Sequence, residues 1–518
     1  MTRWFNVAGP CKADIHYMLP PTARLPELPR LIAQQTYFVL HAPRQTGKTT
    51  AMLALARELT ASGNYIAAVL SVEVGAAFND DIAAAEDAIL SEWRGAVGWQ
   101  LPASLQPASW NDAAPGARIS TVLREWAQQS TLPLVVLIDE IDALRNDALI
   151  SVLRQIRAGY PARPQSFPQS LGLIGLRDVR DYKVASGGSD RLHTASPFNI
   201  KTESITLRTF TAAEVAQLYA QHTADTGQLF TPAAVDLAFD LTQGQPWLVN
   251  ALARQAVEFI EPDLSQPITP TIILEAKERL IVQRATHLDS LAERLREDRV
   301  RQVIGPILGG GSLGDVSEDD IRFVQDLGLA RRDGAGGLVI ANPIYREVIP
   351  RVLATTPEAS LPYITPAWLR ADGTLDLVVL RDAFLAFWRE HGEALLGATP
   401  RSYPEIAPHL VLMAFLHRIV NGHGTLVREY AIGRDRMDLL LSYGAVRLAI
   451  ELKVWRTGRT NPQAAELTQL DAYLDRLGLA TGWLVIFDTR ADQPPIAERT
   501  TTASAITPAG RSITLIWA

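Results

Sequence analysis

The sequence predicts a multidomain α/β protein, and three observations lead to this fold class. The chain has 518 residues, 47% of them hydrophobic, so it can bury several cores, and three or four domains are expected. In the first half, short apolar runs that suit buried strands alternate with amphipathic helical patterns. The C-terminal part repeats this mixture, and short helical patterns with a glycine turn separate the two regions.

The composition excludes several classes of protein. The single cysteine, Cys11, rules out a disulfide framework and suggests a reducing cytosol, so a cytoplasmic protein is expected. No apolar run approaches the length of a membrane span, and the first residues lack the apolar core of a signal peptide. The net charge of −7 gives no general reason to expect nucleic-acid binding, so such a role has to rest on a local patch.

The first motif is a phosphate loop between a strand and a helix. Tyr37–Ala42 predicts a short buried strand, and Ala51–Leu59 predicts a helix. Between them, backbone N–H groups and the helix dipole can receive the phosphates of ATP, Lys48 can reach the β- and γ-oxygens, and Thr49 can ligate Mg²⁺. A chance Gly-Lys-Thr turn is the alternative. The predicted nucleotide-binding residues here are Ala42, Arg44, Gln45, Thr46, Gly47, Lys48, Thr49 and Thr50.

A second strand pattern, Leu132–Ile138, ends in the acids Asp139 and Glu140. Four or more consecutive apolar β-formers indicate a strand buried on both faces, as in a parallel sheet. Acids at its carboxyl end lie where such sheets bind ligands. We expect Asp139 to hold Mg²⁺ through water and Glu140 to polarise the water that attacks ATP. The alternative is a charged helix cap, a reading that suits Asp142 better than the pair.

A third strand pattern, Ser170–Leu176, is followed by Arg177 and Arg180. An arginine at this end of the sheet can sense the γ-phosphate of ATP, and Arg177 is the better placed of the two. Surface charge on a loop is the alternative for both arginines.

The order of these motifs resembles a known family. Gly244-Gln245-Pro246 makes a turn between two amphipathic helical patterns, and Arg24 precedes the first strand. Together with the phosphate loop and the acidic strand end, they resemble the STAND branch of AAA-like P-loop ATPases over roughly the first half of the chain. The resemblance implies an ATP-binding domain over 1–205, a helical lid over 206–285 and Pro246 on the adenine side. It also implies a switch that changes its domain arrangement with nucleotide and can form a homo-oligomer on ATP binding.

The middle of the chain resembles a winged helix over 286–355. Two helices and two strands around a glycine turn are predicted in turn at Arg299–Ile304, Asp319–Leu327 and Leu329–Asn342. Such a module could contact DNA through Arg331 and Arg332. The stronger interpretation is an internal lever, because ATPases of the STAND kind commonly carry one.

Prolines and polar residues between Thr355 and Pro366 predict a linker, placed at 356–363. The last domain, 364–518, is expected to run helix, helix, three strands, helix and a last buried strand. These elements are predicted at Leu375–Leu396, Pro404–Val420, Thr425–Ile432, Met437–Ser442, Ala445–Trp455, Gln463–Leu477 and Trp483–Phe487.

Two carboxylates and a lysine fall on the second and third of these strands. Asp438 and Glu451 can hold Mg²⁺, which activates a water and takes up charge on a scissile phosphate. Lys453 lies two residues after Glu451 and so on the same strand face, where it can position the water or steady the developing charge. The alternative is a structural ion pair.

The order αβββαβ, with Asp438 on the second strand and Glu-x-Lys on the third, resembles the PD-(D/E)XK nuclease superfamily. Met437 stands where the superfamily has its proline. Gln469 and Tyr473 are four residues apart, so they share a helix face. They resemble the Gln-x-x-x-Tyr feature that borders the active site of RecB-like members. The resemblance implies Mg²⁺-dependent cleavage, and Glu405 is the nearest candidate for a further acid.

A local basic patch supports DNA as the partner of this domain. Residues 421–460 contain seven Lys/Arg against four Asp/Glu, a local charge of +3. The sequence thus predicts an ATP-controlled nuclease, suited to defence or repair. A non-catalytic switch, whose last domain only binds nucleic acid or protein, is the rival from another class. An ATP-driven DNA translocase comes third, because no helicase-type motifs accompany the phosphate loop.

Overall fold

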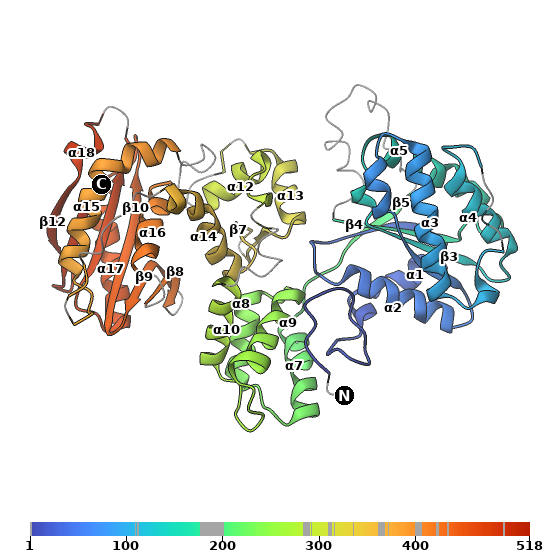
Figure 1. Ribbon diagram of the computed structural model, residues 1–518, viewed down its shortest axis with the longest axis horizontal. Coiled ribbons are helices and arrows are strands. Elements are labelled where there is room, and N and C mark those ends of the chain that lie inside the picture. Colours follow the sequence, from blue (N-terminus) through green and yellow to red (C-terminus); the bar gives the residue numbers. More distant parts are fainter. Residues whose placement is uncertain are drawn as a thin grey trace. The chain divides into compact units, whose positions relative to one another are not determined.

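The computed structural model shows two sheets, each covered by helices, with a helical region between them in the sequence (Figure 1). The described residues are 3–108, 110, 113–176, 201–282, 291, 293–308, 313–314, 316–334, 336–360, 368–370, 372–398, 407–420, 424–432, 435–490 and 493–518. Some side chains within the helices and strands of these ranges are left out of the description.

Contacts between Cα atoms group the chain into two compact units. The first unit comprises Met1–Gln283 and Arg322–Leu329, and the second comprises Arg284–Ile321 and Ala330–Ala518. The segment predicted as a winged helix, 286–355, is therefore divided between the two units. The other predicted domain boundaries stay predictions.

The first unit contains a five-stranded parallel sheet in the order β2-β3-β4-β1-β5. Its strands are β1 (Tyr37–His41), β2 (Ile66–Ser71), β3 (Leu134–Asp139), β4 (Ser170–Gly175) and β5 (Lys201–Thr206). The expected parallel sheet is therefore present. The strands are parallel, so the loops after β1 and β3 lie at the same edge of the sheet. One strand, β4, separates them.

Helices cover both faces of this sheet. On β1, Phe38 and Leu40 belong to one core with the first helices, while Tyr37 and Val39 belong to the opposite core with the later ones. This alternation is the period of two that a strand imposes on its side chains. The helices are α1 (Leu28–Ala33) and α2 (Lys48–Ala61) on one face, and α3 (Ile82–Gln100), α4 (Arg118–Gln129) and α5 (Asn146–Gly159) on the other.

Strand β2 forms one edge of the sheet, and a side chain covers part of it. The Gln100 side-chain amide donates to the Val69 carbonyl oxygen at 2.7 Å and accepts from the Val69 N–H at 2.9 Å. Gln100 is the last residue of α3, so the same helix that packs on the sheet also pairs with its edge.

A helical region follows β5. It consists of α7 (Ala212–Thr226), α8 (Pro232–Thr242), α9 (Pro246–Arg254), a π-helical turn at Gln255–Ile260 and α10 (Pro270–Val282). Its start is well specified, since Thr211 and Glu214 form a reciprocal capping box. Thr231 caps α8, whose first residue is Pro232, a favoured pair at a helix start. Below, the name lid refers to residues 207–282, the described part of the predicted lid (206–285) that follows β5.

The N-terminal segment, residues 3–20, is tied to the lid. Arg3 makes two hydrogen bonds of 2.9 Å with the carboxylate of Asp225 on α7. Phe5 is buried and packs against Tyr17 and Tyr219. The segment also contacts helix α2 beside the parallel sheet, because the Cys11 N–H donates to the Thr50 hydroxyl at 3.1 Å.

The middle of the chain has the elements predicted for it. They are α12 (Asp298–Leu308), α13 (Glu318–Asp326), the antiparallel strands β6 (Ala330–Arg332) and β7 (Leu338–Ile340), and α14 (Pro343–Ser360). Helix α14 continues to Ser360 and so enters the segment predicted as a linker, 356–363, whose boundaries stay a prediction. Ala354, Glu358 and Ala359 favour a helix, so one proline among them does not end it.

The second unit contains a six-stranded mixed sheet in the order β12-β13-β11-β10-β9-β8. Its elements are α15 (Leu377–Ala398), α16 (Ala407–Val420), β8 (Gly424–Ile432), β9 (Asp435–Tyr443), β10 (Val446–Trp455), α17 (Gln463–Leu477), β11 (Gly482–Asp488), α18 (Ile496–Arg499), β12 (Thr501–Ile506) and β13 (Ser512–Trp517). Helices α15 and α16 share one core with the sheet, and α17 packs in the opposite core.

Two sequence predictions about this sheet need correction. The strand at Trp483–Phe487 is not the last, because β12 and β13 extend the sheet beyond β11. Their signal was available in the alternation of Ser512–Trp517, which follows a Pro-Ala-Gly turn. In addition, the strand predicted at Met437–Ser442 begins two residues earlier, because β9 spans Asp435–Tyr443.

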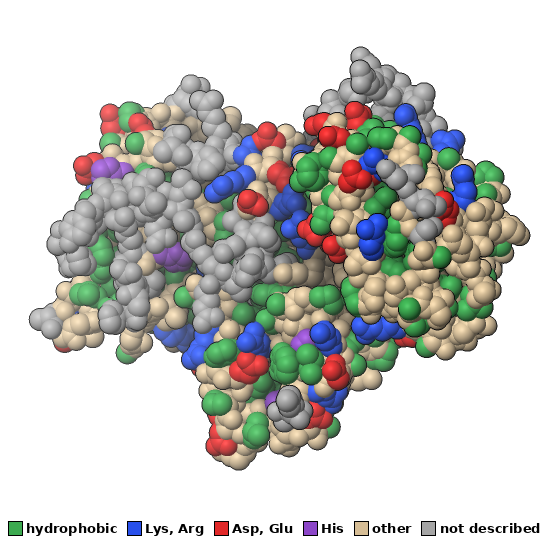
Figure 2. All heavy atoms as spheres, turned by 45° about the vertical axis from the view of Figure 1, so that its right-hand side comes forward, with side chains coloured by type: hydrophobic (Ala, Val, Ile, Leu, Met, Phe, Trp, Pro, Cys, Tyr) green, Lys and Arg blue, Asp and Glu red, His purple; other side chains and the backbone are tan. Residues whose placement is uncertain are grey.

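Among the helices that the structure describes, none combines the length and apolar character that a membrane crossing requires. On the face drawn in Figure 2, basic and acidic side chains are interspersed among apolar ones. Among the described residues on that face, this mixture agrees with the modest net charge of −7.

Candidate functional site

The loop between β1 and α2 has the backbone shape that a phosphate loop needs. Gln45 and Gly47 have positive φ angles of 60° and 90°, so the chain turns sharply before α2 begins at Lys48. A side chain at position 47 would be strained by this φ, and its Cβ would lie 3.2 Å from the Arg24 guanidinium. Thr46 supports the turn, because its buried hydroxyl donates to the Pro43 carbonyl at 2.9 Å.

The Lys48 side chain lies inside this loop. Its ammonium donates to the carbonyl oxygens of Ala42 at 2.8 Å and Pro43 at 3.1 Å, and the residue is 9% exposed. Burial lowers the pKa of Lys48, and the nearby carboxylates of Glu140, Asp142 and Asp139 oppose that shift. Lys48 is thus a cation held beside the helix N-terminus, as phosphate binding requires.

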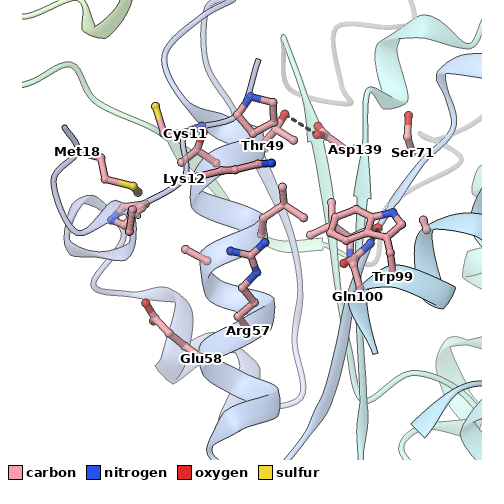
Figure 3. Close-up of a pocket in the computed structure, with 18 of the residues that line it drawn as sticks. Cys11, Lys12, Met18, Thr49, Arg57, Glu58, Ser71, Trp99, Gln100 and Asp139 are labelled. Carbon is pink, nitrogen blue, oxygen red and sulfur yellow. Dashed lines mark hydrogen bonds between the residues drawn. The ribbon is translucent and has the colours of Figure 1, made fainter. Parts of the chain in front are cut away.

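Thr49 and Asp139 bring the two sequence motifs together. The Thr49 hydroxyl donates to the Asp139 carboxylate at 2.7 Å (Figure 3), and Asp139 is 4% exposed. Burial raises the pKa of Asp139, and the hydrogen bonds from Thr49 and the Glu140 N–H act against this. Both side chains present oxygen atoms at the end of the phosphate loop, which fits a Mg²⁺ ligand set.

Glu140 follows β3 in a strained backbone conformation. Its φ of 56° and ψ of 37° are left-handed, a conformation that costs about 1 kcal/mol or more for a residue other than glycine. Burial raises the pKa of Glu140, and the charges of Asp139 and Asp142 add to this effect. Asp142 has a structural role, because its carboxylate accepts a hydrogen bond from the Leu176 N–H after β4 at 3.1 Å.

Arg24 connects the phosphate loop to the lid. Its guanidinium donates to the Thr46 carbonyl at 3.1 Å and to the Arg208 carbonyl, which precedes α7, at 2.9 Å. It also lies over the Phe210 ring, 4.9 Å from the centroid. Burial lowers the pKa of Arg24 to about 10. One side chain thus holds the loop and the entrance to the lid together.

The turn at Gly244 makes a second contact, between the start of the lid at Phe210 and the turn that precedes α9. The Phe210 N–H donates to the Gly244 carbonyl at 2.8 Å, and Gly244 has a φ of 71°. A Cβ on Gly244 would lie 1.9 Å from the Phe210 oxygen, so only glycine fits. Pro246 follows as the first residue of α9 and is buried. The Gly-x-Pro turn therefore lies at the point where the lid meets the chain leaving β5.

A cavity of about 610 Å³ lies beside the phosphate loop (Figure 3). It runs from Thr49 and Asp139 along α2 and is bounded by the N-terminal segment and α3. The cations Lys12 and Arg57 and the ring of Trp99 line it. Sequence reasoning missed these three residues, because they come from separate elements and carry no motif.

The remaining predicted residues at this end of the chain fall at different places. Thr50 is engaged by the Cys11 N–H. Arg44 lies exposed in the loop, next to Gln45 with its positive φ. Arg177 and Arg180 lie outside the described residues, so the predicted γ-phosphate sensor stays a prediction.

At the other end of the chain, Asp438 on β9 meets β10. The Asp438 carboxylate accepts a hydrogen bond of 2.8 Å from the Leu452 N–H, the backbone group between Glu451 and Lys453. Strands β9 and β10 are antiparallel, with Ile450 opposite Leu439. This pairing brings Asp438 next to the Glu-x-Lys sequence, as the motif predicted.

Glu451 is surrounded by predicted partners. It is 2% exposed, and one carboxylate oxygen accepts from the Gln469 side-chain amide at 2.9 Å. The same amide donates to the Tyr473 hydroxyl at 2.9 Å, so the Gln-x-x-x-Tyr pair lies at Glu451. Within the described residues, the second oxygen of Glu451 is buried without a hydrogen-bond partner. Burial, followed by the charges of Asp438 and Glu466, raises the pKa of Glu451.

Sequence reasoning missed one acid at this site. Glu466, on the first turn of α17, forms an ion pair of 2.8 Å with Lys453. Its spacing was a usable signal, since Glu466 precedes Gln469 by three residues and Tyr473 by seven, one helix face.

Some predicted neighbours cannot be placed. Glu405 lies outside the described residues, as do residues 421–423 and 433–434 of the basic patch predicted at 421–460. In the described part of the chain, no three His, Cys, Asp or Glu side chains form a group arranged to hold a metal ion. The candidate Mg²⁺ ligands here are therefore two, Asp438 and Glu451. Their carboxylate oxygens, including the unpartnered one of Glu451, suit a hard cation.

Comparison with known proteins defines the class of the first domain. Residues 38–159 match the sequence model of AAA, the ATPase family associated with various cellular activities. This region, which contains the phosphate loop, Asp139 and Glu140, is thus an AAA-type P-loop ATPase domain, as the sequence predicted. No curated protein gave a significant match to the chain.

Solved structures are similar only at low identity. A Walker-type ATPase of Pyrococcus abyssi has a TM-score of 0.45 at 11% identity, covering 66% of this chain and 98% of its own. The Aeropyrum pernix ORC2 protein has a TM-score of 0.39 at 14% identity, covering 67% and 95%. The Thermotoga maritima RuvB Holliday junction branch migration motor has 0.34 at 16%, covering 62% and 90%.

Proposed function

We propose that this chain is an ATP-dependent switch whose AAA-type domain controls a Mg²⁺-dependent DNA nuclease in its C-terminal domain, 364–518. The observation that carries the nuclease part is the arrangement around Glu451. Asp438 binds the Leu452 N–H beside Glu451, Gln469 binds the Glu451 carboxylate, and the Tyr473 hydroxyl accepts from the same Gln469 amide. A structural ion pair would not require this set.

The ATP chemistry follows from the residues at the sheet edge. Lys48 and the N-terminus of α2 would bind the β- and γ-phosphates, exchanging the Ala42 and Pro43 carbonyls for phosphate oxygens. Thr49 and Asp139 would hold Mg²⁺, which would neutralise charge on the phosphates. Glu140, with its raised pKa, would accept a proton from the attacking water.

The nuclease chemistry uses one helix and two strands. Asp438 and Glu451 would hold Mg²⁺, which would activate water and take up phosphate charge. Gln469 fixes the Glu451 carboxylate through one oxygen and leaves the other for the cation. Lys453 would steady the charge that develops on the phosphate.

Two further residues support binding of a phosphate backbone here. Arg447 near the start of β10 and Arg459 in the turn that follows this strand are exposed. Trp455 is not available as a stacking platform, because Arg490 lies 3.5 Å above its ring and Trp517 packs beside it. Cationic contacts, rather than base stacking, would therefore position the DNA.

The signal between the two sites would pass through the lid. Arg24 ties the Thr46 carbonyl of the phosphate loop to Arg208 at the lid entrance, so a shift in the loop on nucleotide exchange would reach the lid. The predicted winged-helix segment, 286–355, would then act as the lever.

Cleavage of plasmid and single-stranded DNA in Mg²⁺ or Mn²⁺, with and without ATP, tests the proposal. Asp438→Ala should abolish cutting, Lys48→Ala should alter its ATP dependence, and the exposed control Asp382→Ala should cut like wild type. Cutting that survives Asp438→Ala would reject the site. DNA binding with no cutting under any condition would favour the non-catalytic switch.

A further inference from the structure

Glu466 lies on the helix face that forms one wall of the proposed nuclease site. It occupies the first turn of α17, and Gln469 and Tyr473 follow on the same face. Gln469 contacts Glu451, and Glu466 contacts Lys453, two residues further along β10. The helix therefore makes one polar contact to each side chain of the Glu-x-Lys sequence.

The Lys453–Glu466 pair differs from an ordinary surface ion pair. The Glu466 side chain is 7% exposed, whereas that of Lys453 is 45% exposed. A buried carboxylate is costly to keep unless a cation or several donors compensate it, while an exposed lysine needs no partner. The acid is thus fixed in the protein, and the lysine reaches back to it from the solvent side.

Glu466 and Glu451 each keep one carboxylate oxygen without a hydrogen-bond partner among the described residues. One oxygen of Glu466 is bound by Lys453, and within the described residues the other is buried without a hydrogen-bond partner. Glu451 has the same arrangement, with one oxygen held by Gln469 and one unpartnered. A helix anchor that only stabilised the fold would be expected to satisfy its buried acceptors.

We propose that Glu466 is a positioning residue of the C-terminal site, which holds the Lys453 ammonium in the place where it meets the scissile phosphate. This inference rests on the proposed nuclease function. Without Glu466, the half-exposed lysine would be free to adopt its other rotamers, and the cation would be in place for only a fraction of the time. Glu466 would act on the scissile phosphate only through Lys453, and measuring at saturating Mg²⁺ separates this from its other effect, the raised pKa of Glu451.

A double-mutant cycle tests that statement on the full-length protein. Glu466→Gln keeps the size of the side chain and removes its charge. We expect kcat for DNA cleavage to fall by about 100-fold, as for loss of a preorganised group that stabilises charge, while KM for DNA and the thermal midpoint stay near wild type. Glu466→Gln combined with Lys453→Ala should cut no more slowly than Lys453→Ala alone.

Asp475→Asn is the matched control for this cycle. Asp475 lies on the same helix and pairs with Arg511, but its side chain is 74% exposed. It should cut like wild type. Unchanged kcat in Glu466→Gln, or a rate loss that multiplies with Lys453→Ala, would overturn the positioning role while leaving the nuclease itself established.

Amine labelling gives a second readout that does not depend on cleavage. With acetic anhydride at fixed pH, Lys453 in Glu466→Gln should label at least about tenfold faster than in wild type, because an ion-paired hydrogen bond of about 1.5 kcal/mol or more is lost. Lys12, in the other unit, should label at the same rate in both. Equal labelling of Lys453 would overturn the inference, and a wild-type protein that never cuts would overturn it together with the proposed function.

Discussion

The Thr49 hydroxyl donates a 2.7 Å hydrogen bond to the carboxylate of Asp139, although 90 residues separate them in the sequence. The contact joins the start of α2 to the end of β3 across the intervening strand β4. It aligns a hydroxyl and a carboxylate, both suited to Mg²⁺, beside the phosphate loop. The sheet order thus converts two distant motifs into one site, and the first prediction concerns this pair.

Asp139→Asn should reduce ATP hydrolysis by about 100-fold or more, because it removes the charge that would hold the metal at the phosphates. The amide can still accept the Thr49 hydrogen bond, so the thermal midpoint without nucleotide should change little. Phosphate release at saturating MgATP measures the effect. Asp147→Asn, at an exposed site on α5, is the control and should hydrolyse ATP like wild type. Equal rates in the two variants would contradict the assigned role of Asp139.

Glu140→Gln should retain ATP and lose hydrolysis by about 100-fold, the usual contribution of a general base. The pH profile carries a second test. Because burial and then Asp139 and Asp142 raise the pKa of Glu140, the basic form appears only above the ordinary carboxylate range, and the rate should fall as pH drops through that raised value. Asp142→Asn removes one of the raising charges and should move this acid limb to lower pH. If the acid limb of the pH profile does not move, it reports the titration of a group other than Glu140.

Gly244→Ala should destabilise the lid far more than Gly227→Ala. Both glycines have positive φ, 71° and 81°, so each substitution carries a backbone strain of about 1 kcal/mol. At Gly227 a Cβ meets nothing within 4 Å, whereas at Gly244 it meets the Phe210 oxygen at 1.9 Å. We expect a further loss of about 3 kcal/mol at Gly244, the scale of a severe core clash. Calorimetric unfolding midpoints of the two variants give the comparison. Equal midpoints would show that the Phe210 backbone can move away from the added Cβ at little cost.

Binding of Mn²⁺ to the C-terminal site should tighten as pH rises. Burial, then Asp438 and Glu466, raise the pKa of Glu451, so near neutral pH a cation has to displace the proton of this carboxyl. Displacement of one proton predicts about a tenfold gain in affinity per pH unit, until the pH passes the raised pKa. Electron paramagnetic resonance titrations at several pH values measure this binding. Glu451→Gln should remove the pH-dependent component, and affinity independent of pH in the wild type would count against Glu451 as a ligand.

The sequence predicted the nucleotide site well because its signals are local. A strand, a glycine-containing loop and a helix start are adjacent at Tyr37–Ala61, and the acids directly follow an apolar strand. In the C-terminal part, Asp438, Glu451, Lys453, Gln469 and Tyr473 also lie on the predicted strands and helix, while their role as a site stays a prediction. Periodicity and turn chemistry suffice when the functional residues lie at element ends or on one face.

Other features depended on contacts that no local pattern encodes. Lys12, Arg57 and Trp99 line one cavity from three elements, and only the fold brings them together. The role of Arg24 as a bridge needs two carbonyl oxygens whose positions the sequence does not reveal. Helix α14 continues past the expected linker start, since the local helix preference of Ala354, Glu358 and Ala359 outweighs the proline among them.

The reciprocal hydrogen bonds between Gln100 and Val69 have a consequence for how copies of this protein can meet. An open strand edge invites a neighbouring chain to add its own strand, a common route to aggregation. At this point of β2 both backbone groups are already occupied, and an incoming strand would have to displace an amide that satisfies each of them. Growth of the sheet from molecule to molecule is thereby blocked at Val69. Pairing of two copies through this stretch of β2 is therefore disfavoured.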